Sequence, residues 1–152
     1  MHAYQATIDW QSDGAAFTKG RYSRAHTWSF DGGAVWPASA SPSVVPLPFS
    51  DETAVDPEEA MVAAISSCHM LWFLDYARRA GFTVTRYRDS AVGQMTTEAD
   101  GRMWLSHVDL RPEVTWDGAA PDPATLRNLH HQAHESCFIA NSVKTEIDVH
   151  LT

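Results

Sequence analysis

The chain has 152 residues, of which 44% are hydrophobic and 11% aromatic. It is therefore long and apolar enough to bury the core of one globular domain, and we expect a single domain over residues 1–152. Its 19 acidic residues outweigh 11 basic ones, which gives a net charge of -8. Without a cluster of lysine and arginine, such a chain is not expected to bind nucleic acid.

The sequence gives no targeting or membrane signal. Its first residues lack a basic region followed by an apolar run, and no uninterrupted apolar stretch approaches the ~18 residues of a membrane span. We therefore predict a cytoplasmic protein that does not bind a membrane.

The first third of the chain predicts a hairpin followed by a long arm. Residues 3–10 and 22–30 show partial period-two alternation, with turn residues between them, which is typical of two paired strands. Residues 36–55 contain four prolines and four serines, too many for a regular element. We expect these residues to form a long loop or arm with several apolar contact points.

The clearest helix signal begins at Asp56. This residue is a good N-cap, Pro57 suits the first turn, and Glu58 and Glu59 complement the positive end of the helix dipole. The pattern predicts a helix to about residue 80, ended by Gly81. Its middle has almost no polar face, so we expect it to be buried on most sides.

The remaining chain predicts three strands, a helix and a final strand. The strands are expected over residues 82–88, 90–97 and 103–116. A second helix is expected from Asp122 to about Ser136, and residues 142–151 alternate as a strand. The predicted order is β-β-α-β-β-β-α-β, which indicates an α+β fold.

Two cysteines are too few for a disulfide scaffold, but they are candidates for thiol chemistry. Cys68 lies in the middle of the first predicted helix, so a cation from elsewhere is needed to favour its thiolate. Arg21, Arg24 and His69 are the candidates, and Glu58 is a carboxylate that would hold the arginine. Taken alone, Cys68 fits a buried packing residue better than a nucleophile.

Cys137 ends the second predicted helix, and its position favours thiol chemistry over simple packing. The following residues 138–141 suit another short turn, whose free N–H groups would favour a thiolate at Cys137. A second thiol in such a place would resolve a sulfenic acid on the first. The alternative is a cysteine that only fills a gap at the helix end.

Histidines offer a competing interpretation. His130 and His134 are four residues apart on one helical face, a spacing that chelates transition metals, and His131 or Cys137 would complete the set. Solvated or packed histidines explain this spacing better. His26 and His69 would tune a thiolate, although hydrogen-bonded core histidines are the commoner outcome.

Three segments stand out together: the stretch from Asp56 to Leu74 with its alanine-rich helix and Cys68, residues 22–33, and the run from Cys137 to Ser142 just before the last strand. Together they resemble the OsmC/Ohr family of hydroperoxide-reducing proteins. The resemblance spans essentially the whole chain, and the order of elements agrees with it. Phe138 and His69 depart from the family pattern, in which proline commonly follows the second cysteine and a small or aromatic residue follows the first.

The resemblance implies a function and a set of site residues. Cys68 would attack the peroxide, and Cys137 would capture the sulfenic acid as a disulfide that a dithiol reductant then opens. Glu58 would hold an arginine, Arg24 or alternatively Arg21, beside the thiolate. The resemblance further implies an intertwined homodimer that acts on organic hydroperoxides without metal or other cofactor.

One alternative from another functional class stays open. The same fold would serve as a non-catalytic protein that binds an apolar ligand at the dimer interface, or a metal through His130 and His134.

Overall fold

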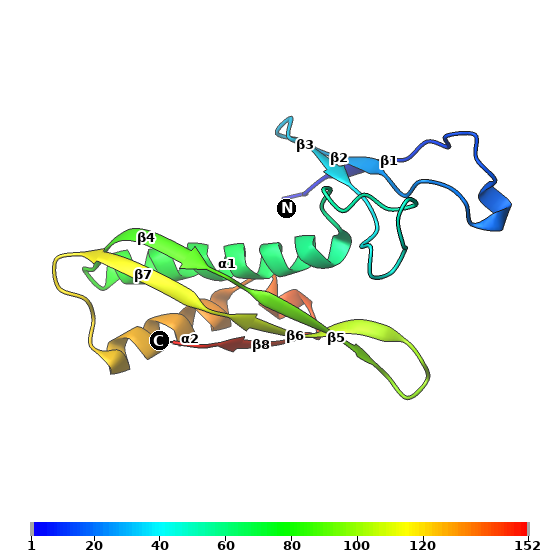
Figure 1. Ribbon diagram of the computed structural model, residues 1–152. Coiled ribbons are helices and arrows are strands. Elements are labelled where there is room, and N and C mark those ends of the chain that lie inside the picture. Colours follow the sequence, from blue (N-terminus) through cyan, green and yellow to red (C-terminus); the bar gives the residue numbers. More distant parts are fainter. Residues whose placement is uncertain (1, 152) are drawn as a thin grey trace. The chain divides into compact units, whose positions relative to one another are not determined.

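The computed structural model describes residues 2–151 (Figure 1). The chain divides into two compact units, one ending at Ala60 and one beginning at Met61, and each is described by itself. The expectation of a single domain stays a prediction.

The first unit contains a three-stranded antiparallel sheet in the order β1-β2-β3. Its strands are β1 (Ala6–Asp9), β2 (His26–Phe30) and β3 (Val35–Ala38), with the short 3-10 helix η1 (Phe17–Lys19) between the first two. The predicted hairpin is confirmed, because β1 pairs with β2 from Ala6 opposite Phe30 to Asp9 opposite Thr27.

The third strand, β3, lies partly in the segment predicted as an arm. Proline usually breaks a strand, but Pro37 lies in the edge strand of this sheet, opposite Thr27. Its carbonyl still accepts a hydrogen bond from the Val55 N–H at 3.2 Å. The missing N–H of proline therefore costs this edge strand little, and the prediction of an irregular arm was wrong for these residues.

Helix α1 (Pro57–Arg79) begins and ends almost where the sequence predicts. The Glu59 N–H donates to Asp56 Oδ1 at 2.8 Å, and the Asp56 N–H donates to Glu59 Oε2 at 3.2 Å. These two bonds form a capping box that satisfies free donors at the helix start.

The expectation that α1 is buried on most sides was wrong for this chain. Its buried residues form one stripe with a spacing of four residues, namely Ile65, His69, Phe73 and Ala77. Leu71, on another side, is 61% exposed. Its own chain therefore covers one side of the helix and leaves other apolar side chains in solvent.

By length and composition alone, α1 is long and apolar enough to cross a membrane. Core helices of soluble proteins pass the same test, and the stripe from Ile65 to Ala77 packs in the protein core. The helix therefore carries no argument for a membrane protein.

The second unit contains two small sheets, two helices and a short turn. Its other elements are β4 (Thr83–Asp89), β5 (Val92–Thr97), β6 (Met103–Leu110), β7 (Pro112–Asp117), α2 (Pro123–Ser136), η2 (Ala140–Ser142) and β8 (Glu146–Val149). One sheet pairs β4 with β7, and the other has the order β5-β6-β8. Only β6 and β8 among these pairs run parallel.

The segment predicted as one strand over residues 103–116 is two strands, which corrects the predicted order. The chain leaves β6 at Arg111, whose N–H donates to Asp89 Oδ1 at 2.7 Å, and Pro112 then begins β7 opposite Asp89. Together with β3, this break gives the observed order β-β-β-α-β-β-β-β-α-β over the described residues. The predicted α+β class is confirmed.

Two hydrophobic clusters hold the second unit together. Phe73 and Ala77 of α1 pack with Leu129 and Ala133 of α2, against side chains of β4 and β7. Ile65 of α1 packs on the second sheet with residues of β6 and β8, among them Leu105, Val108, Leu110, Ile147 and Val149. The middle of α1, which carries Cys68, is therefore fixed against both sheets.

Gly93 in β5 gives a test of this packing. A Cβ at this position would lie 2.6 Å from Val62 Cγ2 and 2.8 Å from Leu105 Cδ1, so a neighbour must move. We expect Gly93→Ala to lower the free energy of unfolding by about 1–3 kcal/mol through overpacking. Urea unfolding at pH 7 measures this change. Gly118→Ala is an unsuitable control because Gly118 has a positive φ of 85°, whereas Gly32→Ala meets no atom within 4 Å and should change little.

Candidate functional site

Two free thiols from different helices meet in the second unit. Cys68 is partly exposed in α1, and Cys137 is 1% exposed at the C-terminal cap of α2. The Cys68 thiol lies close enough to Cys137 to raise the pKa of the Cys137 thiol. The structure thus brings together the two cysteines that the sequence analysis singled out.

The surroundings of Cys137 disfavour its thiolate. The Ala140 N–H donates to Cys137 Sγ at 3.4 Å, as the predicted turn requires. Burial nevertheless raises the pKa of the Cys137 thiol to about 11, and the neighbouring Cys68 adds to the rise, while the N–H groups of Ala140 and Ile139 oppose it. The expectation of a favoured thiolate at Cys137 was therefore wrong, because burial outweighs the backbone donors.

Aromatic side chains hold the Cys137 segment against α1. Phe138 meets the Trp72 ring edge to face, with ring centroids 5.4 Å apart. Ser136 Oγ lies 2.7 Å from the hydroxyl of Tyr76. Trp72 follows Cys68 by four residues and thus shares its face of α1. An apolar wall therefore stands beside the partly exposed thiol.

His69, next to Cys68 in sequence, pairs with His130 inside the core. His69 Nε2 lies 3.0 Å from His130 Nδ1, and the two rings stack with 6° between their planes. Both residues are buried, 1% and 3% exposed. Burial lowers the pKa of His69 to about 4 and that of His130 to about 3. His69 is thus a packed, neutral histidine.

The predicted thiolate-stabilising pair lies in the first unit. Arg24 donates to the carbonyls of Gly20 and Tyr22, at 2.9 and 2.6 Å, and its guanidinium stands 3.6 Å from the centre of the Tyr22 ring. Glu58 is partly exposed in the first turn of α1. Within residues 2–151, no ion pair joins Glu58 to Arg24 or to the exposed Arg21.

The histidines of α2 line a cavity of about 440 Å³ together with apolar residues of the C-terminal segment. Its lining consists of Arg127, His130, His131, His134, Val149 and Leu151. Because His130 Nδ1 is already paired with His69, only its Nε2 is left for a metal. The metal-capable groups that residues 2–151 assemble lie elsewhere, in β6, in β8 and directly after β8.

His26 likewise has ordinary partners. Its Nδ1 lies 2.7 Å from the Arg24 carbonyl, and its Nε2 accepts from the Trp28 indole at 2.9 Å. The prediction of hydrogen-bonded histidines is therefore confirmed for His26 and His69.

Fold and site together define an α+β protein with two neighbouring thiols, one on a long helix and one buried at the end of the second helix. Residues 50–152 match the family model described as OsmC-like protein. The chain therefore belongs to the OsmC-like family.

Solved structures agree with this assignment. An OsmC-like protein of unknown function from Vibrio cholerae is 49% identical, with complete coverage of both chains and a TM-score of 0.96. The organic hydroperoxide resistance protein OhrB of Bacillus subtilis has a TM-score of 0.72 at 15% identity, covering 99% of this chain and 98% of its own. An organic hydroperoxide resistance protein OsmC from Legionella pneumophila has a TM-score of 0.71 at 16% identity, with coverages of 99% and 96%. The last two proteins share the fold of this chain. The search of curated proteins found no match to the chain.

Proposed function

We propose that the protein is a cysteine-based peroxidase that reduces organic hydroperoxides. The observation that carries this proposal is the proximity of the partly exposed Cys68 to the buried Cys137. Support also comes from the family and from structural neighbours whose names describe organic hydroperoxide resistance. The apolar wall of Trp72 and Phe138 suits an organic rather than a small polar peroxide.

In the first proposed step, the Cys68 thiolate attacks one peroxide oxygen. An S–O bond forms, the O–O bond breaks, and the remaining alkoxide leaves as an alcohol after taking up a proton. Sulfur is oxidised to a sulfenic acid while the peroxide is reduced. Cys68 is the better attacking thiol because it is partly exposed, whereas Cys137 is 1% exposed and its pKa is raised to about 11.

In the second proposed step, Cys137 resolves the sulfenic acid. Its thiol loses a proton, its sulfur bonds to Cys68 sulfur, and the sulfenic oxygen leaves as water. An external dithiol then reduces this disulfide by thiol–disulfide exchange and is itself oxidised. Both cysteines are free thiols at the start of the cycle, which suits the reducing cytoplasm proposed for this protein.

Arg24 and Glu58 complete the proposed site. We assign Arg24 to the thiolate of Cys68 and Glu58 to holding the guanidinium, in a homodimer. The exposed apolar residues Leu71, 61% exposed, and Phe138, 66% exposed, support a partner surface on and beside α1. In the proposed homodimer, the Arg24 guanidinium would exchange its present carbonyl partners for the Glu58 carboxylate. A carboxylate binds a guanidinium more strongly than a carbonyl does.

The direct test is to mix fully reduced protein with one equivalent of an organic hydroperoxide. We expect stoichiometric loss of both thiols within seconds and a Cys68–Cys137 disulfide in the mass spectrum. Hydrogen peroxide, added to a parallel sample, should react more slowly because it gains nothing from the apolar wall. Thiols that react no faster than free cysteine would refute the peroxidase and favour a non-catalytic ligand-binding protein.

A further inference from the structure

Strands β6 and β8 carry a second group of chemically active side chains, outside the thiol site. The two strands run parallel, with His107 opposite Glu146 and Asp109 opposite Asp148. The intervening residues Val108, Leu110, Ile147 and Val149 belong to the core cluster around Ile65. Because strand side chains alternate, the histidine and the carboxylates share the face turned away from this core.

An irregularity in β6 separates this polar face from Leu105. Gln94 pairs with His107, but the next residue of β5, Met95, pairs with Leu105, so Ser106 is an extra residue in β6. The bulge lets Leu105 point into the core although it is two residues before His107.

The ligand atoms of this face lie close together. His107 Nε2 is 3.2 Å from Asp109 Oδ1 and 3.4 Å from Asp148 Oδ2. His150, directly after β8, places Nε2 2.6 Å from the same Asp109 oxygen. One ligand atom each of Asp109, Asp148 and His150 lies within 4.8 Å of the others. His150 and two carboxylates thus lie together, and His107 of β6 adjoins both carboxylates.

The two separations from His107 fit a tetrahedral metal ion. Zinc bonds of about 2.0–2.2 Å to nitrogen and oxygen require ligand atoms about 3.3–3.6 Å apart. The two distances from His107 Nε2, 3.2 and 3.4 Å, are close to that range. The Asp109–His150 contact must open by somewhat less than 1 Å, when the ion replaces the hydrogen bonds that both imidazoles make to Asp109 Oδ1.

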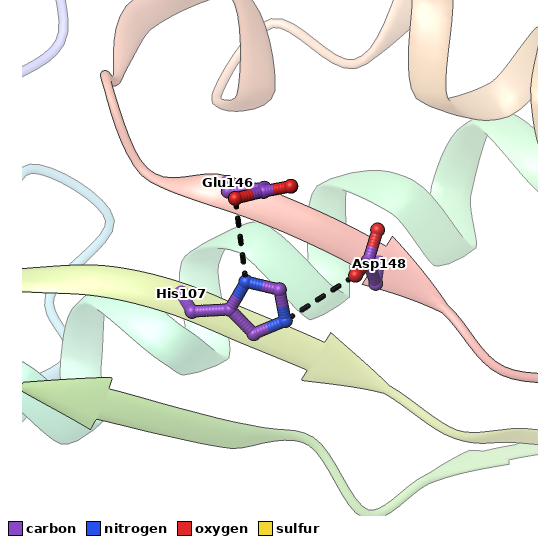
Figure 2. Close-up of side chains that lie close together, drawn as sticks. All are labelled: His107, Glu146 and Asp148. Atoms are coloured by element: carbon purple, nitrogen blue, oxygen red, sulfur yellow. Dashed lines mark ion pairs between the residues drawn. The ribbon is translucent and has the colours of Figure 1, made fainter.

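Three neighbours match the role of outer partners. His107 Nδ1 faces the Glu146 carboxylate at 3.9 Å, on the side of the ring opposite Asp148 (Figure 2). A carboxylate there favours a proton on Nδ1 and leaves the Nε2 lone pair for a metal. Arg111 and Gln94 donate to the other oxygen of Asp109, both at 3.3 Å, and fix its orientation.

We propose that His107, Asp109, Asp148 and His150 form a zinc site that fastens β8 to β6. Within the described residues, Asp148 and Glu146 have no lysine or arginine partner, so a cation offsets the repulsion of the gathered carboxylates. Imidazole with carboxylate is a ligand set that suits zinc, and β8, the end strand of its sheet, gains most from a crosslink.

Zinc titration of chelator-treated, reduced protein without a histidine tag tests the site. Competition with a chromophoric chelator should give one zinc per chain. His107→Gln and Asp148→Asn should each lower the affinity by more than about 100-fold, and Glu146→Gln by about 10-fold. His131→Gln, which removes an exposed histidine of α2, is the matched control and should change the affinity less than about twofold.

Cobalt distinguishes this site from the cysteines and serves as the second readout. Cobalt bound by nitrogen and oxygen gives visible d–d bands without the near-ultraviolet charge transfer of a thiolate ligand.

At free zinc of about 100 times Kd, the melting temperature should rise by about 5–10 °C in the wild type and not in Asp148→Asn. Asp148 is 55% exposed, so this variant should fold.

Three results would overturn the proposal: no zinc bound, wild-type affinity in both His107→Gln and Asp148→Asn, or a thiolate band with cobalt. None of them bears on the peroxidase.

Discussion

Cys68→Ser should reduce hydroperoxide turnover by about a thousandfold or more. Serine keeps the shape of cysteine, but its hydroxyl stays protonated at neutral pH and is a far weaker nucleophile. Removing the nucleophile of an enzyme commonly costs even more than this factor. Because Cys68 is partly exposed, the substitution should leave the fold and stability almost unchanged. Peroxide consumption in the presence of excess dithiol is the measurement.

Cys137→Ser is the matched variant because the two thiols have different roles in the proposed cycle. It should still consume one equivalent of hydroperoxide in a single turnover, and leave a sulfenic acid on Cys68 that a dimedone probe traps. Its circular dichroism must be checked, since a hydroxyl at a position only 1% exposed costs stability. Turnover that survives Cys68→Ser, or a dimedone adduct on residue 137 of the wild type, would refute this assignment of roles.

Capping residues in the sequence correctly identified where the two helices begin, because a helix start depends on nearby residues alone. Asp56 and Glu59 form the capping box at the start of α1, and Asp122 caps α2 by accepting from the N–H groups of Ala124 and Thr125. Sequence signals failed where a partner strand decides the outcome. Pro37 is compatible with a strand only because β3 is an edge strand, and Arg111 breaks a segment that alternates continuously in sequence.

The site was predictable to a different extent. Thiol chemistry singled out Cys68 and Cys137, and the resemblance implied their separate roles. They are 69 residues apart, so no spacing rule would have joined them. Likewise, 61 residues separate His69 from His130, so the stacked imidazole pair becomes visible only in the fold. The alternation of His107 with Asp109 and of Glu146 with Asp148 was a signal available in the sequence. Its meaning depended on the parallel register of β6 and β8.

The exposed side of α1 shows why burial is hard to infer from composition. Leu71 lies in an apolar stretch, which predicts burial, yet it is 61% exposed in this chain. An apolar helix surface of this kind costs free energy in water unless something covers it. A second copy of the chain is the cover proposed above, and it would make the sequence pattern and the burial consistent with each other.

Acid should destabilise the protein well above the pH at which carboxylates become protonated. His69 and His130 are neutral in the fold because burial lowers their pKa values to about 4 and about 3. In the unfolded chain, both should titrate near 6.5. Between these values the unfolded chain binds more protons than the folded one, so stability falls as the pH falls from about 7.

The expected size follows from linkage. Each imidazole loses about 2 kcal/mol of stabilisation between pH 7 and pH 5, so the pair loses about 4 kcal/mol. Asp109 and Asp122 have pKa values below 3.8 because hydrogen bonds favour their charged forms. They should contribute only at lower pH. The charge of His134 lowers the pKa of His69 further, while Asp89 raises it.

Urea unfolding at pH 7, 6 and 5, with reductant and a metal chelator present, measures this dependence. His130→Gln should remove about half of the loss or more, since it abolishes one buried imidazole and frees the other from its stacked partner. His131→Gln, one residue along α2 but exposed, should leave the slope unchanged. Equal stability of the wild type at pH 7 and pH 5 would show that the pair is not held neutral. In that case the ring nitrogens left without a partner within residues 2–151, His69 Nδ1 and His130 Nε2, must reach water or a second chain.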